Sequence, residues 1–292
     1  MSNSHQGLSK SPREKQQQKM KPNGVVKQDT LKNLIDDAAA EYICPITTEL
    51  PLNPVIAEDG RVYERTAIEC HMNTQGGNLK SPVTNEPMGR KLVPAVQVQN
   101  TIKLFISSGV IGEEKSAAWK ERKENTELVE ETRRKAEIGD SDRMVNLGRW
   151  YFKGGKGLTK DRAVGYQWLK KASDMHNVRG MAWAGMCLMN GVGTEKNEVH
   201  GMNLITVAAC RGSEYAAQCL GKWYKNGDFG IPKRMKESKY WLEQIVDGNC
   251  LVKDLTEIGR GEVIKLMKEI DSMSEDGNEL LHSLMHKNAN SH

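Results

Sequence analysis

Three side chains between residues 40 and 110 are of types that bind metals or act as nucleophiles: Cys44, Cys70 and His71. A structural zinc site takes about four Cys or His ligands, so three candidates cannot complete even one such site. A cysteine nucleophile needs a neighbouring base or another feature that activates its thiol, and neither cysteine has one in its stretch of sequence. We therefore expect no metal, no cofactor and no covalent intermediate.

Two other patterns look like chemical sites but are expected to be structural. His282 and His286 are four residues apart, which is a metal-ligand spacing on a helix, but no third ligand is fixed nearby. We therefore expect both to be ordinary surface histidines. The glycine-rich turns of the second half lack the GxxxxGK[ST] pattern of a phosphate-binding loop.

The elements that position the cysteines form a small α+β pattern. VIAEDGRVY (55–63) predicts a short hairpin with an Asp-Gly turn. RTAIECHMN (65–73) has apolar residues four apart and predicts a helix. SPVTNEP (81–87) predicts an irregular loop between two prolines. Residues 92–100 predict extended chain, and 101–107 a final apolar helix.

This segment resembles the U-box, the metal-free relative of the RING domain. The resemblance covers about residues 40–110 and rests on CPIT, DGRVYER, AIE, PVT and the closing LVP…N, in that order. It implies a fold in which hydrogen bonds and salt bridges replace two zinc ions. Their pairing cannot be derived from the sequence. The candidate residues are Glu49, Glu58, Asp59, Arg61, Glu64, Arg65 and Glu69.

The resemblance implies a surface that docks a ubiquitin-conjugating enzyme charged with ubiquitin. Such a domain supplies no nucleophile and accelerates transfer by positioning. Asn85 stands where the family places a hydrogen-bond donor, commonly Arg, that bridges ubiquitin and its carrier. The positions implied to contact the conjugating enzyme are Ile46, Thr48, His71, Pro82 and Val83.

Each of these positions has a structural alternative. The alternative for Ile46 is a place in the core. Its position between a proline and a threonine favours exposure at the surface instead. Pro82 would only shape its loop, and His71 would be an ordinary surface histidine. Asn85 suits a turn, and it is shorter than Arg and uncharged. Thr48 departs from the larger apolar residue common in the family, which would narrow the range of conjugating enzymes.

The second half of the chain repeats itself every 36 or 37 residues, as Gly148, Gly185 and Gly221 show. Apolar residues at helical spacing before paired glycines predict a helical hairpin in each unit, and the recurring helical glycine predicts close helix packing. The pattern resembles Sel-one-like repeats, relatives of tetratricopeptide repeats. The resemblance covers about residues 136–250 and implies an α-solenoid whose concave face binds proteins.

The remaining segments complete a mostly α chain. The chain's excess of positive over negative charge lies in the N-terminal tail, because residues 1–30 contain six Lys or Arg and only two Asp or Glu. We expect a solvated arm there, with no nucleic acid bound. No apolar run is long enough to insert in a membrane, and no apolar leader is seen, so we expect a cytoplasmic protein, with the nucleus as an additional compartment. The expected segments are a basic tail (1–38), the U-box (39–110), a solvated charged linker helix (111–135), three repeats (136–250) and two C-terminal capping helices (251–292).

Two classes of function fit this organisation. The first is a ubiquitin–protein ligase whose U-box docks the conjugating enzyme and whose repeats recruit an unknown protein substrate. The second is a non-catalytic scaffold that only binds protein partners. A chaperone-linked adaptor that captures acidic C-terminal tails is a third possibility. It is disfavoured because no column of Lys or Arg runs through the repeats.

Overall fold

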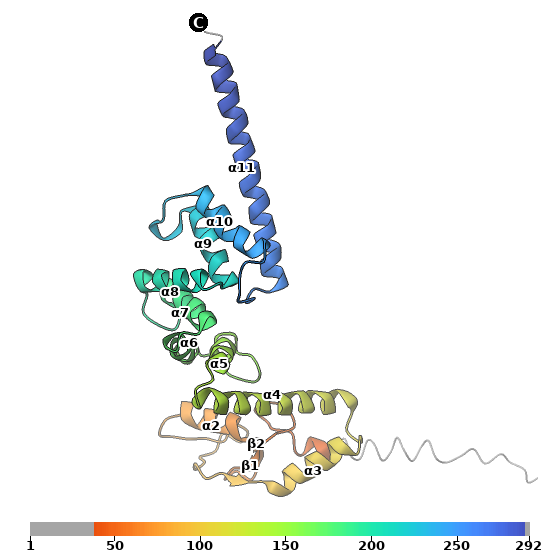
Figure 1. Ribbon diagram of the computed structural model, residues 1–292. Helices are drawn as coiled ribbons and strands as arrows, with labels where there is room; N and C mark the ends of the chain where they lie inside the picture. Colours follow the sequence, from red (N-terminus) through yellow and green to blue (C-terminus); the bar gives the residue numbers. More distant parts are fainter. Residues whose placement is uncertain (1–37, 290–292) are drawn as a thin grey trace, which may run out of the picture. The chain divides into compact units, whose positions relative to one another are not determined.

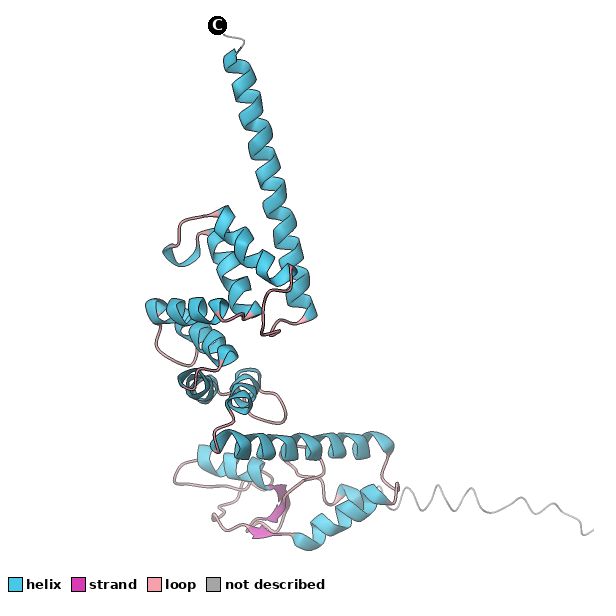
Figure 2. Cartoon of the chain, in the orientation of Figure 1, coloured by secondary structure: helices cyan, strands magenta, loops and turns pink. Residues whose placement is uncertain are grey.

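The computed structural model describes residues 38–289, with side chains described as far as Met273. The described chain divides into two compact units at the Lys123–Glu124 bond, here called the first and the second unit (Figure 1). Helices make up most of the second unit, and the few strands lie in the first, together with helices and loops (Figure 2). The mostly α fold with a small α+β part is therefore confirmed.

A three-stranded antiparallel sheet forms the centre of the first unit. The strands β1 (Pro54–Ile56) and β2 (Val62–Glu64) make the predicted hairpin, with Gly60 at φ +75° in the turn. The strand β3 (Val93–Pro94) pairs with the other edge of β1, giving the order β2-β1-β3. Its two residues lie within the predicted extended chain over 92–100, but their pairing with β1 was not predicted, because a two-residue strand has no periodicity.

Two helices pack against this sheet. In α2 (Arg65–Thr74) the buried residues are Ile68 and Met72, as their spacing predicts. The last helix of the segment, α3 (Val96–Ser107), begins five residues before the predicted start at Thr101. The expected extended chain over 92–100 is therefore wrong for most of its length. Val98 explains the difference, because it lies four residues before Ile102 and joins the same apolar core.

The charged segment is the helix α4 (Glu113–Glu137), but it is less solvated than predicted. In the first unit Trp119 is buried, and its indole N–H donates to the Pro51 carbonyl at 3.3 Å. In the second unit Val129 and Ala136 are buried in the core of the first repeat. Sparse apolar residues among many charges therefore suffice to give α4 a buried side.

Three helical hairpins form the body of the second unit, as the repeat predicts. The pairs are α5 (Ser141–Lys153) with α6 (Arg162–Asp174), α7 (Val178–Asn190) with α8 (Glu198–Cys210), and α9 (Glu214–Asn226) with α10 (Met235–Val246). Each first helix ends at a glycine in the left-handed conformation, namely Gly154, Gly191 and Gly227.

The helical glycines allow the two helices of each hairpin to approach closely. A Cβ atom at Gly148 would lie 2.6 Å from Leu169 Cγ, and one at Gly221 would lie 2.6 Å from a Leu242 methyl carbon. Leu169 and Leu242 are fully buried. An added methyl group would therefore force the helices apart, which confirms the packing reason for these glycines.

The C-terminal segment forms one helix, α11 (Glu257–Ala289), where two helices were predicted. Gly277 lies inside it, and a glycine costs a helix only about 1 kcal/mol relative to Ala, which does not by itself end the helix. Val263 and Ile270 are buried in the core of the last repeat. His282 and His286 lie beyond the residues whose side chains are described.

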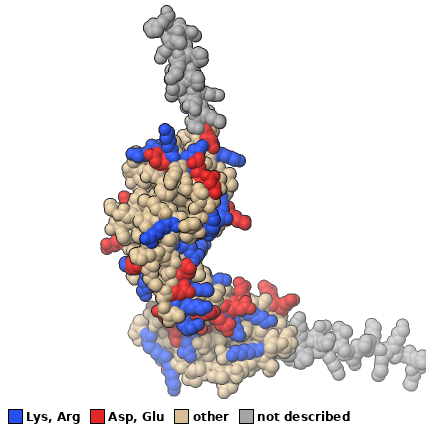
Figure 3. Space-filling model, viewed as in Figure 1, with Lys and Arg blue, Asp and Glu red and all other residues tan. Residues whose placement is uncertain are grey.

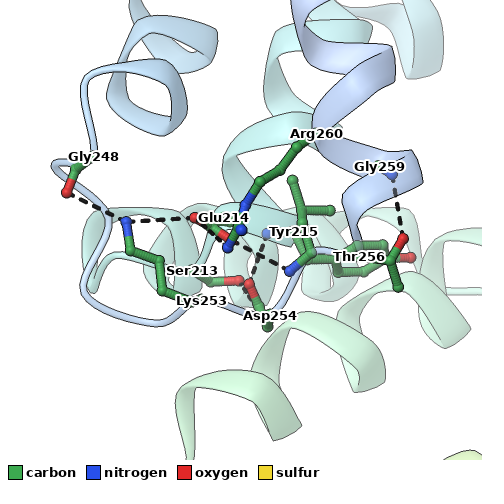
Figure 4. A network of polar contacts seen from close by, with 10 residues as sticks. Ser213, Glu214, Tyr215, Gly248, Lys253, Asp254, Thr256, Gly259 and Arg260 are labelled. Carbon is green, nitrogen blue, oxygen red and sulfur yellow. Dashed lines mark hydrogen bonds and ion pairs between the residues drawn. The ribbon is translucent and has the colours of Figure 1, made fainter.

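An ionic network around the buried Glu214 joins the first turn of α11 and the chain before it to the start of α9 (Figure 4). Glu214 is 1% exposed and pairs with Arg260 at 3.0 Å and with Lys253 at 3.4 Å. Asp254 accepts hydrogen bonds from Ser213 Oγ at 2.7 Å and from Tyr215 N–H at 2.9 Å. Burial raises the pKa of Asp254, although these hydrogen bonds oppose the rise.

We expect Glu214→Gln to destabilise the second unit by about 1–3 kcal/mol, because a buried charged hydrogen-bond acceptor is lost while its cationic partners return to water. Urea unfolding of the full chain followed by circular dichroism measures the change. Glu262→Gln is the matched control, since Glu262 forms a largely solvated pair with Lys222. Equal midpoints for the two variants would contradict a structural role for Glu214.

Candidate functional site

The first loop of the candidate site turns tightly around Cys44. Thr48 N–H donates to the Cys44 carbonyl at 2.8 Å, and Cys44 N–H donates to the Glu49 carbonyl at 2.9 Å. Thr48 adopts a φ of +59° and is exposed. Cys44 is fully buried, whereas Ile46 is 37% exposed. The cysteine therefore packs inside the loop, and the isoleucine is presented at its surface.

The second loop runs from Ser81 to Pro87 and is closed by hydrogen bonds at its base. Ser81 N–H donates to the Glu86 carbonyl at 2.9 Å, and Asn85 N–H donates to the Ser81 carbonyl at 3.0 Å. Pro82 and Asn85 are exposed, and Val83 is 44% exposed. The loop thus presents an apolar pair together with a polar amide.

Asp59 joins the hairpin to this second loop. Its Oδ2 atom accepts the Tyr63 hydroxyl at 2.7 Å and the Ser81 hydroxyl at 2.6 Å, and its Oδ1 atom accepts Arg61 N–H at 3.1 Å. Ser81 Oγ in turn accepts the N–H groups of Val83 and Thr84, both at 3.1 Å. Burial alone would raise the pKa of Asp59, but the three hydrogen bonds outweigh it and hold that pKa below its ordinary value.

Two further carboxylates cross-link loops that lie far apart in the sequence. Glu58 accepts Gly89 N–H and Lys91 N–H, each at 3.1 Å. Glu64 is buried and accepts Leu52 N–H at 2.6 Å. Ionised carboxylates accept stronger hydrogen bonds than neutral groups do. These acceptors hold the loops in place.

The other charged candidates make weaker contacts. Arg65 and Glu69 form a surface pair at 3.5 Å, and Glu49 pairs with Arg122 at 3.1 Å. Exposed ion pairs of this kind stabilise a fold by at most about 1 kcal/mol. Arg61 contributes its backbone N–H, which donates a hydrogen bond to Asp59 Oδ1. Of the acidic candidates, Glu58, Asp59 and Glu64 link distant loops. The sequence did not distinguish them from Glu49 and Glu69, which form surface pairs.

Sequence reasoning missed Ser81, whose hydroxyl links Asp59 to two backbone amides. A serine before Pro-Val-Thr is a local signal for a turn in which the side chain bonds the backbone. That signal identifies the bonds to Val83 and Thr84. It does not identify Asp59, which lies 22 residues earlier in the chain.

His71 connects α2 with the start of the second loop. Its Nε2 atom lies 2.9 Å from the Lys80 carbonyl, so the hydrogen bond forms when that nitrogen carries the proton. The side chain is half-buried. The structure thus fixes the orientation of the imidazole beside the loop that bears Pro82 and Val83.

All six cysteines are free thiols; Cys70 and Cys210 are exposed and the others are buried. Burial raises the pKa of both Cys187 and Cys219 to about 12, which keeps these thiols protonated. In the part of the chain that the structure describes, no group of three or more His, Cys, Asp or Glu side chains could hold a metal ion. Likewise, none of the described helices is long and apolar enough to cross a membrane.

Comparison with known proteins matches both units. A family model for the U-box domain matches residues 38–110, and one for the Sel1 repeat matches 144–177, 178–213 and 216–249. WD repeat, SAM and U-box domain-containing protein 1 from Danio rerio is 49% identical over 66 residues, which are 23% of this chain and 12% of the relative. Putative E3 ubiquitin-protein ligase LIN-1 from Lotus japonicus is 33% identical over 91 residues, 31% of this chain and 5% of the relative.

These two similarities thus span only a small part of each relative's own length. Among solved structures, a Sel1 repeat protein from Oxalobacter formigenes is 25% identical, with a TM-score of 0.37, over 42% of this chain and 89% of that protein. The chain is a U-box domain protein in which the U-box is followed by three Sel1 repeats.

Proposed function

We propose that this protein is a ubiquitin–protein ligase whose U-box docks a charged ubiquitin-conjugating enzyme. The observation that supports this function is the exposure of apolar side chains on two loops that the hydrogen bonds around Cys44 and Asp59 hold in shape. Exposed apolar side chains on ordered loops are typical of protein-binding sites. The proposed contact residues are Ile46, Thr48, His71, Pro82 and Val83.

The U-box would act by positioning alone. Transfer of ubiquitin from the conjugating enzyme to a lysine needs the thioester and the amine in one attack-ready arrangement, and restricting the thioester to that arrangement lowers the barrier. The side-chain amide of Asn85 would donate the hydrogen bond that bridges ubiquitin and the conjugating enzyme that carries it. Its backbone φ of +60° suits Asn better than most residues.

The repeats would recruit the protein whose lysines receive ubiquitin. This role is proposed from the repeat architecture, since stacked helical hairpins offer an extended surface for binding proteins.

The test is discharge of ubiquitin from a panel of charged conjugating enzymes to free lysine, with and without the whole 292-residue chain. We expect accelerated discharge by at least one enzyme, unchanged by a chelator. If no enzyme in a broad panel is discharged faster although the protein is folded, the ligase function is wrong.

A non-catalytic scaffold is the alternative, and Asn85 is the residue that favours it. Asn has a shorter reach than the Arg common at this position and supplies no charge. A scaffold of this kind would bind the conjugating enzyme without accelerating discharge.

Asn85→Arg separates the two functions. A charged hydrogen bond is worth about 1.5–3 kcal/mol, so we expect discharge to rise at least about tenfold, even though Arg is less suited to the positive φ. Asn85→Lys is the matched control, because it adds the charge without the planar fork of donors. A protein that is silent as wild type and active only as Asn85→Arg would support the scaffold.

A further inference from the structure

An open groove of about 510 Å³ lies between α6 and α8 of the first two repeats, over α7. Buried apolar side chains of α7 form its floor: Met181, Ala184 and Leu188. All of its lining residues belong to the second unit. The groove is here called the α6–α8 groove.

The helix on one side of this groove has an unusual surface for an exposed helix. Between Glu198 and the end of α8 at Cys210 there is no Lys, Arg, Asp or Glu. Val199 is 76% exposed and Val207 is 40% exposed, and Val207 lines the groove whereas Val199 does not. Figure 3 shows that a broad area of the second unit has few charged side chains.

The corresponding helices of the neighbouring repeats are different. Both α6 and α10 contain Lys together with Asp or Glu, as expected for a face in contact with water. Depletion of charge combined with exposed aliphatic side chains is the composition found at the centre of protein interfaces. Single exposed apolar residues need no explanation. In α8, however, Val207 is continuous with the apolar floor of a groove.

The charges at the rim specify the partner. Lys170 and Asp174 neutralise each other through a 2.6 Å ion pair. Arg211 lies at the opposite rim and is exposed, and no ion pair of its side chain is found within the described part of the chain. His176 and His200 also line the groove, and among the described residues Asp174 is the only acidic one that does so. Within this part of the chain, the groove therefore has the charge of Arg211 without a counter-charge above an apolar floor.

We propose that the α6–α8 groove binds a short segment of a partner protein that combines an aliphatic side chain with an Asp or Glu. The aliphatic side chain would contact Met181 and Val207, which lie at the same end of the α7–α8 hairpin as Arg211, and the carboxylate would pair with Arg211. This inference rests on the proposed function, in which the repeats recruit the substrate, and it assigns that role to one face of the first two repeats.

The test is a selection of random 12-residue peptides displayed on phage against the whole immobilised chain. We expect enriched peptides that share an aliphatic and an acidic position. A labelled peptide of the consensus sequence should then bind in fluorescence anisotropy, and Val207→Glu should weaken its binding at least tenfold. Thr206→Glu is the matched control, since Thr206 is the exposed neighbour on α8 that does not line the groove.

Reversal of the rim charge gives the sharper result. Arg211→Glu should bind the acidic consensus peptide at least tenfold more weakly than wild type does. In a new selection it should instead enrich peptides with Lys or Arg at the acidic position. The proposal is overturned if no peptide is enriched, if the enriched peptides lack the acidic position, or if Val207→Glu and Arg211→Glu bind them as wild type does.

Discharge of ubiquitin to free lysine distinguishes the two proposals. The groove variants should discharge charged conjugating enzymes at the wild-type rate, because the U-box is unchanged. Peptide binding without any discharge would overturn the ligase function and leave the groove intact. Discharge without enrichment of any peptide would overturn the groove proposal and leave the ligase function intact.

Discussion

Ile46→Ala is expected to abolish most of the ubiquitin discharge that the wild-type protein stimulates. An interface residue of this kind typically contributes about 2 kcal/mol, so binding of the conjugating enzyme should weaken roughly 30-fold. Discharge to free lysine at subsaturating U-box concentration measures the effect. The substitution removes an exposed side chain, so thermal unfolding should be nearly unchanged.

Leu104→Ala is the matched control for this experiment. Leu104 is 63% exposed on α3 and belongs to neither of the two loops. Its loss should leave discharge at the wild-type rate. If Ile46→Ala and Leu104→Ala behave alike, the conjugating enzyme does not dock on the first loop.

Asp59→Ala is expected to unfold the second loop and to inactivate the U-box. The change leaves the buried Tyr63 hydroxyl and the Ser81 hydroxyl without their shared acceptor. Each unsatisfied group costs about 1–3 kcal/mol, which in total approaches the stability of a small domain. Hydrogen exchange over residues 54–64 and 81–88 should show loss of protection in both segments, together with loss of discharge.

Asp59→Asn and Glu69→Ala make this result specific. Asn keeps one acceptor oxygen and should therefore give an intermediate loss. Glu69 forms only a surface pair with Arg65, so its removal should leave protection and discharge unchanged. Wild-type protection of the 81–88 segment in Asp59→Ala would contradict the linking role of this carboxylate.

The pKa of Asp59 also predicts a dependence on pH. Because the folded-state pKa is held below the ordinary value of 3.8, the ionised carboxylate stabilises the fold above that pH, and the stabilisation is lost as the pH falls through the lowered pKa. The difference in free energy of unfolding between wild type and Asp59→Asn should therefore be full at pH 7 and smaller at pH 3. A difference that does not change with pH would show that the charge has no part in it.

The sequence by itself determined those features that depend on neighbours within about one helical turn or one hairpin. The Asp-Gly turn, the apolar face of α2 and the 36-residue recurrence of Gly148 are local patterns, and each has the predicted structure. The absence of sufficient zinc ligands likewise follows from a count of residues. These features need no information about how distant segments meet.

Tertiary structure alone decided which distant groups meet. Three features depend on contacts between segments that are distant in the sequence. They are the pairing of Asp59 with Ser81, the third strand at Val93–Pro94 and the buried side of α4. Such pairings have no period in the sequence, because hydrogen bonds and apolar contacts depend on distance in space. The α6–α8 groove is of the same kind: Met181 and Val207 are ordinary apolar residues until α7 and α8 bring them to the same groove as Arg211.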